Sequence, residues 1–595
     1  MASVMTTHAK EWKPAQNTIM SRWAAGVTPE NVWRDYPRPQ MRRHNWLNLN
    51  GLWDYAITKK DAEIPAEWDG KILVPFPVES ALSGVKKSVG GENALWYRRK
   101  VTIPEEWQGQ RLILHFGAVD WRMTLWINGK QIGKHSGGCD AFSFDITDAV
   151  TAKLEADIVI SVWDPTDDGY QPRGKQVNEP QGIWYTSVTG IWQTVWMEAV
   201  PQAHINSLKI TPDVDNGKVR VEVETAGIDR ESRIADKYFL HLAAISDNKT
   251  ITRAAGNCFG DVLELEIPDA ELWSPDNPFL YDLKVTLTRD DEPLDEVTSY
   301  FAMRKFHVKK DESGINRIYI NGKPIFLFGT LDQGWWPGGL YTPPSDEAMR
   351  YDIEVLKELG MNCIRKHVKV EPLRYYYHCD RLGMIVWQDM PNGDKHISES
   401  DPDITRTAES ETNFRAEWKA IVNMLYNNVS IAIWCPFNEG WGQFKTNEIL
   451  EWTKQLDPTR LVDGPSGWTD RGGGDMYDMH NYPGPGMFPV EESRVSVLGE
   501  FGGLGLPLKG HLWWDKRNWG YRSFKTREEL NDAYINLITK LPQLISKGLA
   551  AAIYTQTTDV EGEVNGLMTY DRKVLKLDAD KVRPHHLKLY QNPPE

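Results

Sequence analysis

The fold follows from two short apolar runs that each end in a glutamate, Ile431-Ala-Ile-Trp-Cys-Pro-Phe-Asn438-Glu439 and Val495-Ser-Val-Leu-Gly-Glu500. Runs of this length without polar alternation are typical of strands that are buried on both faces of a parallel sheet. A carboxylate at the C-terminal end of such a strand lies where α/β barrels keep their catalytic groups. We therefore expect the two glutamates to face each other across the mouth of one barrel.

The region around these runs, from 307 to 595, alternates helical periods with apolar strands. Helices are predicted at 345–359, 374–382, 413–427, 446–454 and 528–546. Strands are predicted at 325–329, 362–365, 384–388, 431–439, 461–463, 476–480, 495–500 and 551–556. Eight strands in this order predict a (β/α)8 TIM barrel in which Glu439 closes the fourth strand and Glu500 the seventh. The link between the fifth and sixth strands leaves little room for a helix.

The chain before this region has the pattern of β-sandwiches. Short alternating runs separated by Gly, Asn, Asp and Pro continue to about residue 200, and a second set of such runs fills about a hundred more residues. We predict a multidomain β and α/β protein with an N-terminal jelly-roll sandwich at 1–201, an immunoglobulin-like sandwich at 202–306 and the barrel at 307–595.

Two carboxyl groups on facing strand ends predict glycosidase chemistry. In a retaining glycosidase the two groups lie about 5 to 5.5 Å apart, one as acid/base and the other as nucleophile. We assign Glu439 as the acid/base, because Trp434 and Phe437 are expected to form an apolar wall that raises its pKa. The amide of Asn438 is positioned to donate a hydrogen bond to the sugar 2-hydroxyl.

Glu500 is then the predicted nucleophile, which has to stay ionised. Tyr482, at the end of the preceding strand, is expected to donate a phenolic hydrogen bond to it, and Arg365 supplies a cationic donor. Further candidates for contact with the substrate follow other strands: His367, His480, Asp332, Trp336, Trp441 and Gln556. Taken alone, such histidines are more often packed or hydrogen-bonded groups, and such tryptophans are as often loop packing as sugar platforms.

Composition limits the classes of partner. The 68 basic and 83 acidic side chains give a net charge of -15, which argues against nucleic acid or an acidic membrane surface as the partner. The five cysteines are widely spaced and predict reduced thiols. We expect no cofactor and no metal, because no close cluster of ligand residues is evident. A soluble protein is expected, in the cytoplasm, or in the periplasm or outside the cell if a leader was removed.

Several motifs resemble those of glycoside hydrolase family 2, which contains β-galactosidases, β-glucuronidases and β-mannosidases. In the sandwich region they are Leu49-Asn-Gly-Leu-Trp53, Trp126-Ile-Asn-Gly129 and Thr189-Gly-Ile-Trp192. In the barrel region they are Ile320-Asn-Gly-Lys-Pro-Ile325, Asn362-Cys-Ile-Arg365, Trp434 to Glu439 and Leu498-Gly-Glu500. The resemblance implies a retaining mechanism with Glu439 as acid/base and Glu500 as nucleophile, and it implies that Arg365, Asn438 and Tyr482 contact the nucleophile or the sugar.

The expected activity is removal of a terminal non-reducing sugar from a glycoside or oligosaccharide, with β-galactose as the first choice. The lysine that β-glucuronidases of the family place in an Asn-x-Lys pair has no counterpart in Asn565-Gly-Leu567, which disfavours glucuronic acid. His367 also follows Arg365 by two residues, where the family motif has three. The alternatives are β-glucuronidase, β-mannosidase, α-L-arabinosidase or β-galactofuranosidase activity, or a non-catalytic carbohydrate-binding protein. The sequence leaves open whether the chain forms a homo-oligomer.

Overall fold

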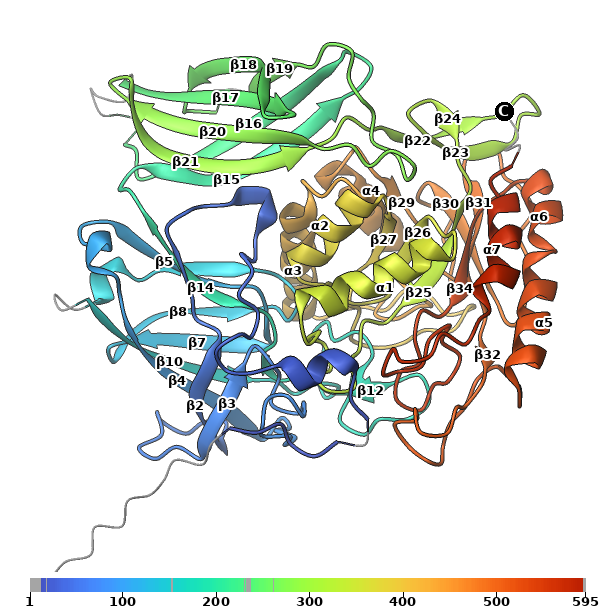
Figure 1. Cartoon of the computed structure of the whole chain (residues 1–595), viewed down its shortest axis with the longest axis horizontal. Helices are drawn as coiled ribbons and strands as arrows, with labels where there is room; N and C mark the ends of the chain where they lie inside the picture. Colours follow the sequence, from blue (N-terminus) through green and yellow to red (C-terminus); the bar gives the residue numbers. More distant parts are fainter. Residues whose placement is uncertain are drawn as a thin grey trace, which may run out of the picture.

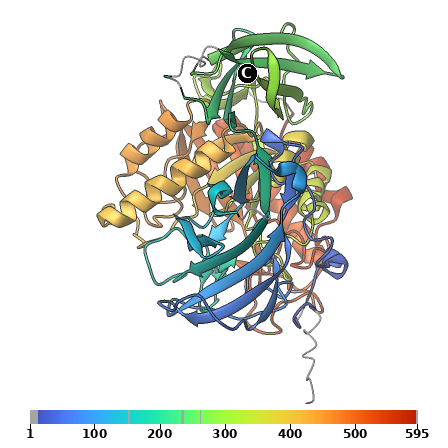
Figure 2. The same ribbon diagram turned by 90° about the vertical axis from the view of Figure 1, so that its left-hand side faces the viewer.

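A computed structural model of the protein describes residues 12–17, 19–150, 154–229, 231, 237–260 and 262–591. Two β-sandwiches, blue to cyan and green in Figure 1, pack against a barrel drawn in yellow to red. The view at 90° in Figure 2 places the second sandwich at one end of the molecule. The predicted fold class is confirmed, whereas the predicted domain boundaries stay a prediction. No described helix is long and apolar enough to cross a membrane.

The first sandwich packs a six-stranded antiparallel sheet, ordered β3-β2-β4-β10-β7-β8, against a four-stranded sheet, ordered β1-β14-β5-β9. Side chains that alternate along these strands fill the core between the sheets. The strands are β1 (Trp46–Asn48), β2 (Gly51–Lys59), β3 (Gly70–Val74), β4 (Asn93–Thr102), β5 (Arg111–Phe116), β7 (Arg122–Ile127), β8 (Lys130–Ser136), β9 (Phe142–Asp145), β10 (Glu155–Trp163) and β14 (Val195–Val200). Short strands β6 (Val119–Asp120), β11 (Gln176–Val177), β12 (Tyr185–Thr186) and β13 (Gly190–Ile191) lie in its loops.

The second sandwich packs a three-stranded sheet, β15-β16-β19, against a four-stranded sheet, β18-β17-β20-β21. Its strands are β15 (His204–Asp213), β16 (Lys218–Ala226), β17 (Tyr238–Ser246), β18 (Lys249–Asn257), β19 (Val262–Glu266), β20 (Tyr281–Arg289) and β21 (Glu292–Phe301). Strict alternation of buried and exposed residues along β16 is typical of a sheet with one solvated face. A small sheet then leads into the barrel: β22 (Phe306–Lys310), β23 (Asn316–Ile320) and β24 (Lys323–Pro324).

Eight parallel strands form the barrel in the order β29-β28-β27-β26-β25-β34-β31-β30, and a bridge between Asp463 and Met476 joins the two ends of this order. The strands are β25 (Leu327–Asp332), β26 (Cys363–Lys366), β27 (Ile385–Asp389), β28 (Ile431–Cys435), β29 (Leu461–Val462), β30 (Met476–Asn481), β31 (Val495–Gly502) and β34 (Leu549–Thr555). Glu439 therefore follows the fourth strand and Glu500 lies in the seventh, as predicted. The short strands β32 (Leu504–Gly505) and β33 (Arg522–Ser523) pair outside the barrel.

The helices surround most of the barrel: α1 (Asp346–Glu358), α2 (Leu373–Leu382), α3 (Ala408–Leu425), α4 (Thr446–Leu456), α5 (Arg527–Ile538), α6 (Leu541–Lys547) and α7 (Ala579–Lys588). The helix predicted at 413–427 begins earlier, because the Thr407 side chain caps it at Ser410. The helix predicted at 528–546 is two helices, and Pro542 stands in the first turn of the second. Between β29 and β30 the described chain has no helix, as the short link predicted.

Candidate active site

Glu439, His480 and Glu500 meet at the C-terminal ends of β28, β30 and β31. One carboxylate oxygen of each glutamate and one ring nitrogen of His480 all lie within 4.8 Å of one another. This is the short carboxylate separation of retaining glycosidases, since inverting enzymes keep about 6.5 to 9.5 Å for a water. The side chains of Glu439 and Glu500 are only 13% and 6% exposed. Both carboxylates are therefore largely shielded from solvent. Three such groups are also close enough to hold a metal ion.

Glu439 stands in a strained backbone position. Its φ of 49° lies in the left-handed region, which is uncommon for a residue with a side chain. The backbone N–H of Glu439 donates to the Ser466 carbonyl at 2.8 Å, and Asn438 forms a parallel bridge with Ser466. These contacts fix the turn after β28, so the Glu439 carboxylate is aimed across the barrel toward β31.

One hydrogen-bond donor and one cation hold the Glu500 carboxylate. The Tyr482 hydroxyl donates to Oε2 at 2.6 Å, and Nη1 of Arg365 lies 3.5 Å from Oε1. Burial and the neighbouring Glu500 charge raise the pKa of Tyr482 well above its ordinary value, so the phenol keeps its proton. The Tyr482 ring also stacks on Tyr521 at 3.8 Å, and its hydroxyl lies 2.6 Å from Thr555 Oγ1. The carboxylate is thus oriented by groups that cannot easily move.

Arg365, at the end of β26, forms hydrogen bonds to residues at several other strand ends near the two glutamates. Its guanidinium donates to Asp389 at 3.0 to 3.2 Å, to the Gly499 carbonyl at 3.2 Å and to Asn438 Oδ1 at 2.9 Å. Because the oxygen of the Asn438 amide accepts from Arg365, the NH2 group of that amide is left to donate. This Nδ2 atom is buried without a hydrogen-bond partner, as a donor to a sugar hydroxyl would be before substrate binds.

The prediction of an apolar wall around the Glu439 carboxylate is wrong. In a barrel strand successive side chains alternate between the interior and the helix layer. Trp434 points to the helix layer, where its ring meets Trp418 edge to face at 5.7 Å. Phe437 stacks on Phe414 of α3 at 5.6 Å. Both aromatic rings lie on the helix side of the strand. The pKa of the Glu439 carboxylate is governed by a polar neighbour instead.

That neighbour is His480, whose Nδ1 lies 2.7 Å from Glu439 Oε1. Burial would raise the pKa of Glu439, but the hydrogen bond and charge of His480 outweigh it, and the net pKa is lowered. Burial likewise opposes protonation of His480, while Glu500 and Glu439 raise its pKa above the ordinary value. Both shifts favour an ionised Glu439 beside a protonated His480. A low pKa for the free Glu439 corrects the expectation of a raised one.

The other predicted residues divide into two groups. His367 and Trp441 lie at the pocket: His367 Nδ1 is 2.9 Å from Asp389 Oδ2 and 3.9 Å from Glu500 Oε1, and the Trp441 ring is 6.1 Å from that of His367. Gln556 follows β34 next to Thr555, and its Oε1 is buried without a partner. Contact of these three side chains with a substrate stays a prediction.

Asp332 and Trp336 have other neighbours. The Asp332 carboxylate accepts from Lys366 Nζ and from the Tyr375 hydroxyl, each at 3.0 Å. Trp336 packs edge to face with Trp23 at 6.1 Å, and the Arg572 guanidinium lies 3.8 Å from its ring centre. Neither residue contacts Glu439 or Glu500. Their predicted sugar contacts have no support in this arrangement.

The first sandwich supplies part of the pocket, which the sequence did not indicate. The N–H groups of Arg173 and Gly174 donate to the Asn392 carbonyl at 3.2 and 3.0 Å. Trp184 packs on Trp441 with ring centres 4.8 Å apart. Near His480, Ser466 Oγ lies 2.7 Å and Asp478 Oδ2 3.9 Å from Nε2. Neither these two residues nor Asp389 was singled out from the sequence, although the position of Asp389 at the end of an apolar run was a signal that could have found it.

Comparison with known proteins gives several relatives. A putative β-glucuronidase of Formosa agariphila is 26% identical over 450 residues, 72% of this chain and 52% of the relative. A β-galactosidase of Thermoanaerobacter pseudethanolicus is 26% identical over 327 residues, 51% of this chain and 40% of the relative. The chain thus spans about half the length of these curated relatives. The structure of a β-D-glucuronidase of Dictyoglomus thermophilum has the same fold, with a TM-score of 0.74, 18% identity and coverage of 94% of this chain and 100% of the other.

Three family models match consecutive parts of the chain. They are described as the sugar binding domain of glycosyl hydrolases family 2 at 71–201, glycosyl hydrolases family 2 at 203–304, and the TIM barrel domain of the same family at 312–473. Together they span more than half of the sequence in the order of its two sandwiches and its barrel. The chain belongs to glycosyl hydrolases family 2.

Proposed function

We propose that the protein is a retaining exo-β-glycosidase that acts by double displacement, with Glu500 as nucleophile and Glu439 as acid/base. The observation that carries this proposal is the placement of one oxygen of each carboxylate and a ring nitrogen of His480 within 4.8 Å of one another at the C-terminal ends of barrel strands. At that separation one carboxylate reaches the anomeric carbon while the other reaches the glycosidic oxygen.

In the first step a Glu500 oxygen forms a bond to the anomeric carbon as the bond to the leaving oxygen breaks. The proton held by the Glu439 and His480 pair passes through Glu439 to that oxygen. In the second step Glu439 takes a proton from a water, and the water oxygen displaces Glu500 from the sugar. Asn438 Nδ2 donates to the 2-hydroxyl, where hydrogen bonding strengthens in the transition state.

Burial of the two carboxylates supports action on a terminal sugar. Trp184 of the first sandwich lies against Trp441 and covers one side of the barrel mouth. Exposed aromatic rings of Trp468 and Tyr521, which are 40% and 47% accessible, stand around the entrance. Such rings are suited to stacking on an aglycone sugar. One sugar ring at the glutamates and an exposed rim for the leaving group are typical of an exo-acting enzyme.

On the sequence motifs alone, β-galactose is the first sugar to test, because the sequence lacks the Asn-x-Lys pair at 565–567. Glucuronic acid is the second, since several of the relatives and similar structures bear the name β-glucuronidase.

A panel of aryl β-glycosides tests the proposal. We expect release of nitrophenol from at least one of the β-galactoside, glucoside, mannoside, glucuronide, galacturonide and xyloside or from the α-arabinoside, with the β anomer formed first from a β-linked substrate by NMR. Glu500→Ala should release none. Saturable sugar binding without release from any member would favour the carbohydrate-binding alternative and overturn the proposal. First formation of the inverted anomer would overturn the mechanism.

A further inference from the structure

Lys175 is a buried lysine of the first sandwich whose ammonium has no partner within the part of the chain that the structure describes. The residue is 5% exposed. Among the described residues, no carboxylate lies within 4.0 Å of Nζ and no hydrogen bond from Nζ is formed; the neighbour it has is the Tyr185 ring, 5.6 Å from Nζ. Burying a charge without a counter-charge is costly. An unpaired ammonium in this position therefore indicates a site for an anionic ligand.

The backbone places Lys175 between two strand ends of the catalytic barrel. Gly174 has a left-handed φ of 59°, and a Cβ on it would overlap the Val368 carbonyl. Its N–H donates to Asn392, whose side-chain Oδ1 accepts from the Asn438 N–H at 3.2 Å. Val368 directly follows His367, and Asn438 directly precedes Glu439. The segment that carries Lys175 is thus anchored to the neighbours of two pocket residues.

The charge of Lys175 acts on the same two residues. Burial and, next to it, the Lys175 charge hold the pKa of His367 well below its ordinary value. For Glu439, where burial is opposed by His480, the Lys175 charge adds to the lowering of the pKa. Both effects require the ammonium to lie near these groups, in keeping with the backbone contacts.

Lys175 differs from the other cations near Glu439 and Glu500 in lacking a carboxylate partner among the described residues. Arg365 has Asp389 as its partner, and His480 has Glu439. Lys175 has none at bonding distance. During the reaction Glu500 becomes an ester and loses its charge, while positive charge develops on the sugar. A lone ammonium would oppose that change unless the substrate brings a negative group of its own.

We propose that Lys175 is a specificity-determining residue that binds a carboxylate on the sugar, so that the preferred substrate is a β-linked uronic acid. This inference rests on the proposed glycosidase function and names its substrate class. The sequence disfavoured glucuronic acid because 565–567 lacks a lysine. In the folded chain a lysine from the first sandwich provides the positive charge instead.

Paired substrates test the role of Lys175. We would measure kcat/KM on p-nitrophenyl β-glucuronide against the β-glucoside, and on the β-galacturonide against the β-galactoside. The wild type should have the higher kcat/KM on the acidic substrate of each pair. Lys175→Met should lower the ratio of kcat/KM on the acidic substrate to kcat/KM on the neutral one by about 100-fold, which is the scale of losing one partner of a buried charge pair. Lys175→Arg should keep part of the preference. Lys100→Met, the same change at an exposed position of β4, should leave the ratio unchanged.

A loss that is equal on acid and neutral substrates would show a structural role or a contact to a hydroxyl, and would overturn the inference. Calorimetry with free D-glucuronate, D-galacturonate, D-glucose and D-galactose separates this result from failure of the enzyme proposal. If uronate binds, Lys175→Met abolishes that binding and no glycoside is turned over, the carboxylate site is supported and the glycosidase proposal is overturned. If neutral glycosides are turned over but no uronate binds, the glycosidase proposal is supported and the carboxylate site is overturned. Neither binding nor turnover would overturn both.

Discussion

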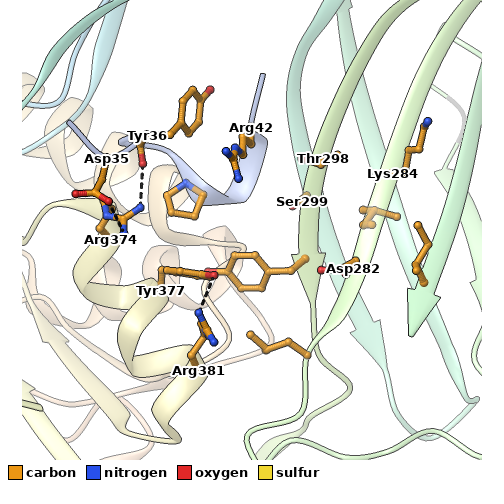
Figure 3. Close-up of a pocket in the computed structure, with 15 residues that line it drawn as sticks. Asp35, Tyr36, Arg42, Asp282, Lys284, Thr298, Ser299, Arg374, Tyr377 and Arg381 are labelled. Carbon is orange, nitrogen blue, oxygen red and sulfur yellow. Dashed lines mark hydrogen bonds and ion pairs between the residues drawn. The ribbon is translucent and has the colours of Figure 1, made fainter. Parts of the chain in front are cut away.

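The strand ends around Glu439 and Glu500 and the cleft between the domains differ in character. The cleft in Figure 3 is large, about 780 Å³, and lies between the N-terminal segment, helix α2 and the second sandwich. In it Arg374 pairs with Asp346 at 2.6 Å and donates to the Tyr36 carbonyl at 3.2 Å. Arg381 donates to the Tyr377 hydroxyl at 3.4 Å. Both of these arginines therefore have a partner within the chain.

The strand ends contain buried groups that lack partners. Asn438 Nδ2 and Gln556 Oε1 are buried without a hydrogen-bond partner. Lys175 is 5% exposed, and no hydrogen bond or ion pair of its Nζ is formed within the described residues. Buried polar groups in proteins are almost always satisfied. Unsatisfied ones also occur elsewhere in this chain, as at Ser21 and Trp68. The strand ends differ because such groups stand there beside a close pair of carboxylates, a combination that the volume of the cleft does not reveal.

The largest effect is expected at the nucleophile. Glu500→Ala removes the group that attacks the anomeric carbon, and kcat should fall by about 10⁴-fold or more. The measurement is kcat on the best aryl glycoside of the panel, with circular dichroism to show that the variant is folded. A folded variant that keeps a tenth of wild-type turnover would remove Glu500 from the mechanism.

Glu439→Ala should be selective for the leaving group. Loss of general acid catalysis should lower kcat/KM by about 10²- to 10⁴-fold on a methyl or sugar aglycone. The decrease should be much smaller on dinitrophenyl glycosides, because that leaving group departs without a proton. An equal loss on every aglycone would contradict the assignment of Glu439 as the acid/base.

Tyr482→Phe removes one hydrogen-bond donor from Glu500 and keeps the ring that stacks on Tyr521. One hydrogen bond to a charged group is worth about 1.5 to 3 kcal/mol, so kcat/KM should fall by about 10- to 100-fold. The thermal midpoint serves as the control. Loss of stability without loss of kcat/KM would mean that the hydroxyl has a packing role.

The pH profile tests the shared proton. His480 is protonated below a pKa that lies above its ordinary 6.5, and it loses the proton as pH rises through that value. The basic limb of kcat/KM should therefore lie above pH 6.5 in the wild type. In His480→Asn the limb should move to lower pH, because Glu439 alone then holds the proton. An unmoved limb would show that the proton belongs to another group.

The smallest effect is expected in the cleft. Arg381 is exposed in the last turn of α2, and Arg381→Ala should change kcat/KM by less than about twofold and the free energy of unfolding by about 0.5 kcal/mol or less. Chemical denaturation and the aryl glycoside assay measure both. A large loss of turnover would show that the cleft is coupled to the barrel mouth.

The sequence was sufficient for the parts of the site that depend on strand ends. Parallel strands bring their C-terminal ends to one edge, so Glu439, Glu500, Arg365 and Tyr482 could be grouped by counting strands. The sequence was insufficient where packing between residues far apart in the chain determines the position of a side chain. Lys175 reaches the pocket from another domain, and no local pattern around it reports that contact. The outward direction of Trp434 depends on the barrel alternation, which reverses with a shift of one residue.

The central claim is that Glu500 forms a covalent bond to the sugar. The most direct measurement is mass spectrometry of peptides after incubation with a 2-deoxy-2-fluoro glycoside of the preferred sugar, carrying a dinitrophenyl leaving group. The account predicts one added fluoroglycosyl mass on the peptide that contains Glu500, and none on the Glu500→Ala variant. A label on Glu439, or full turnover of a substrate with no label on any peptide, would contradict it.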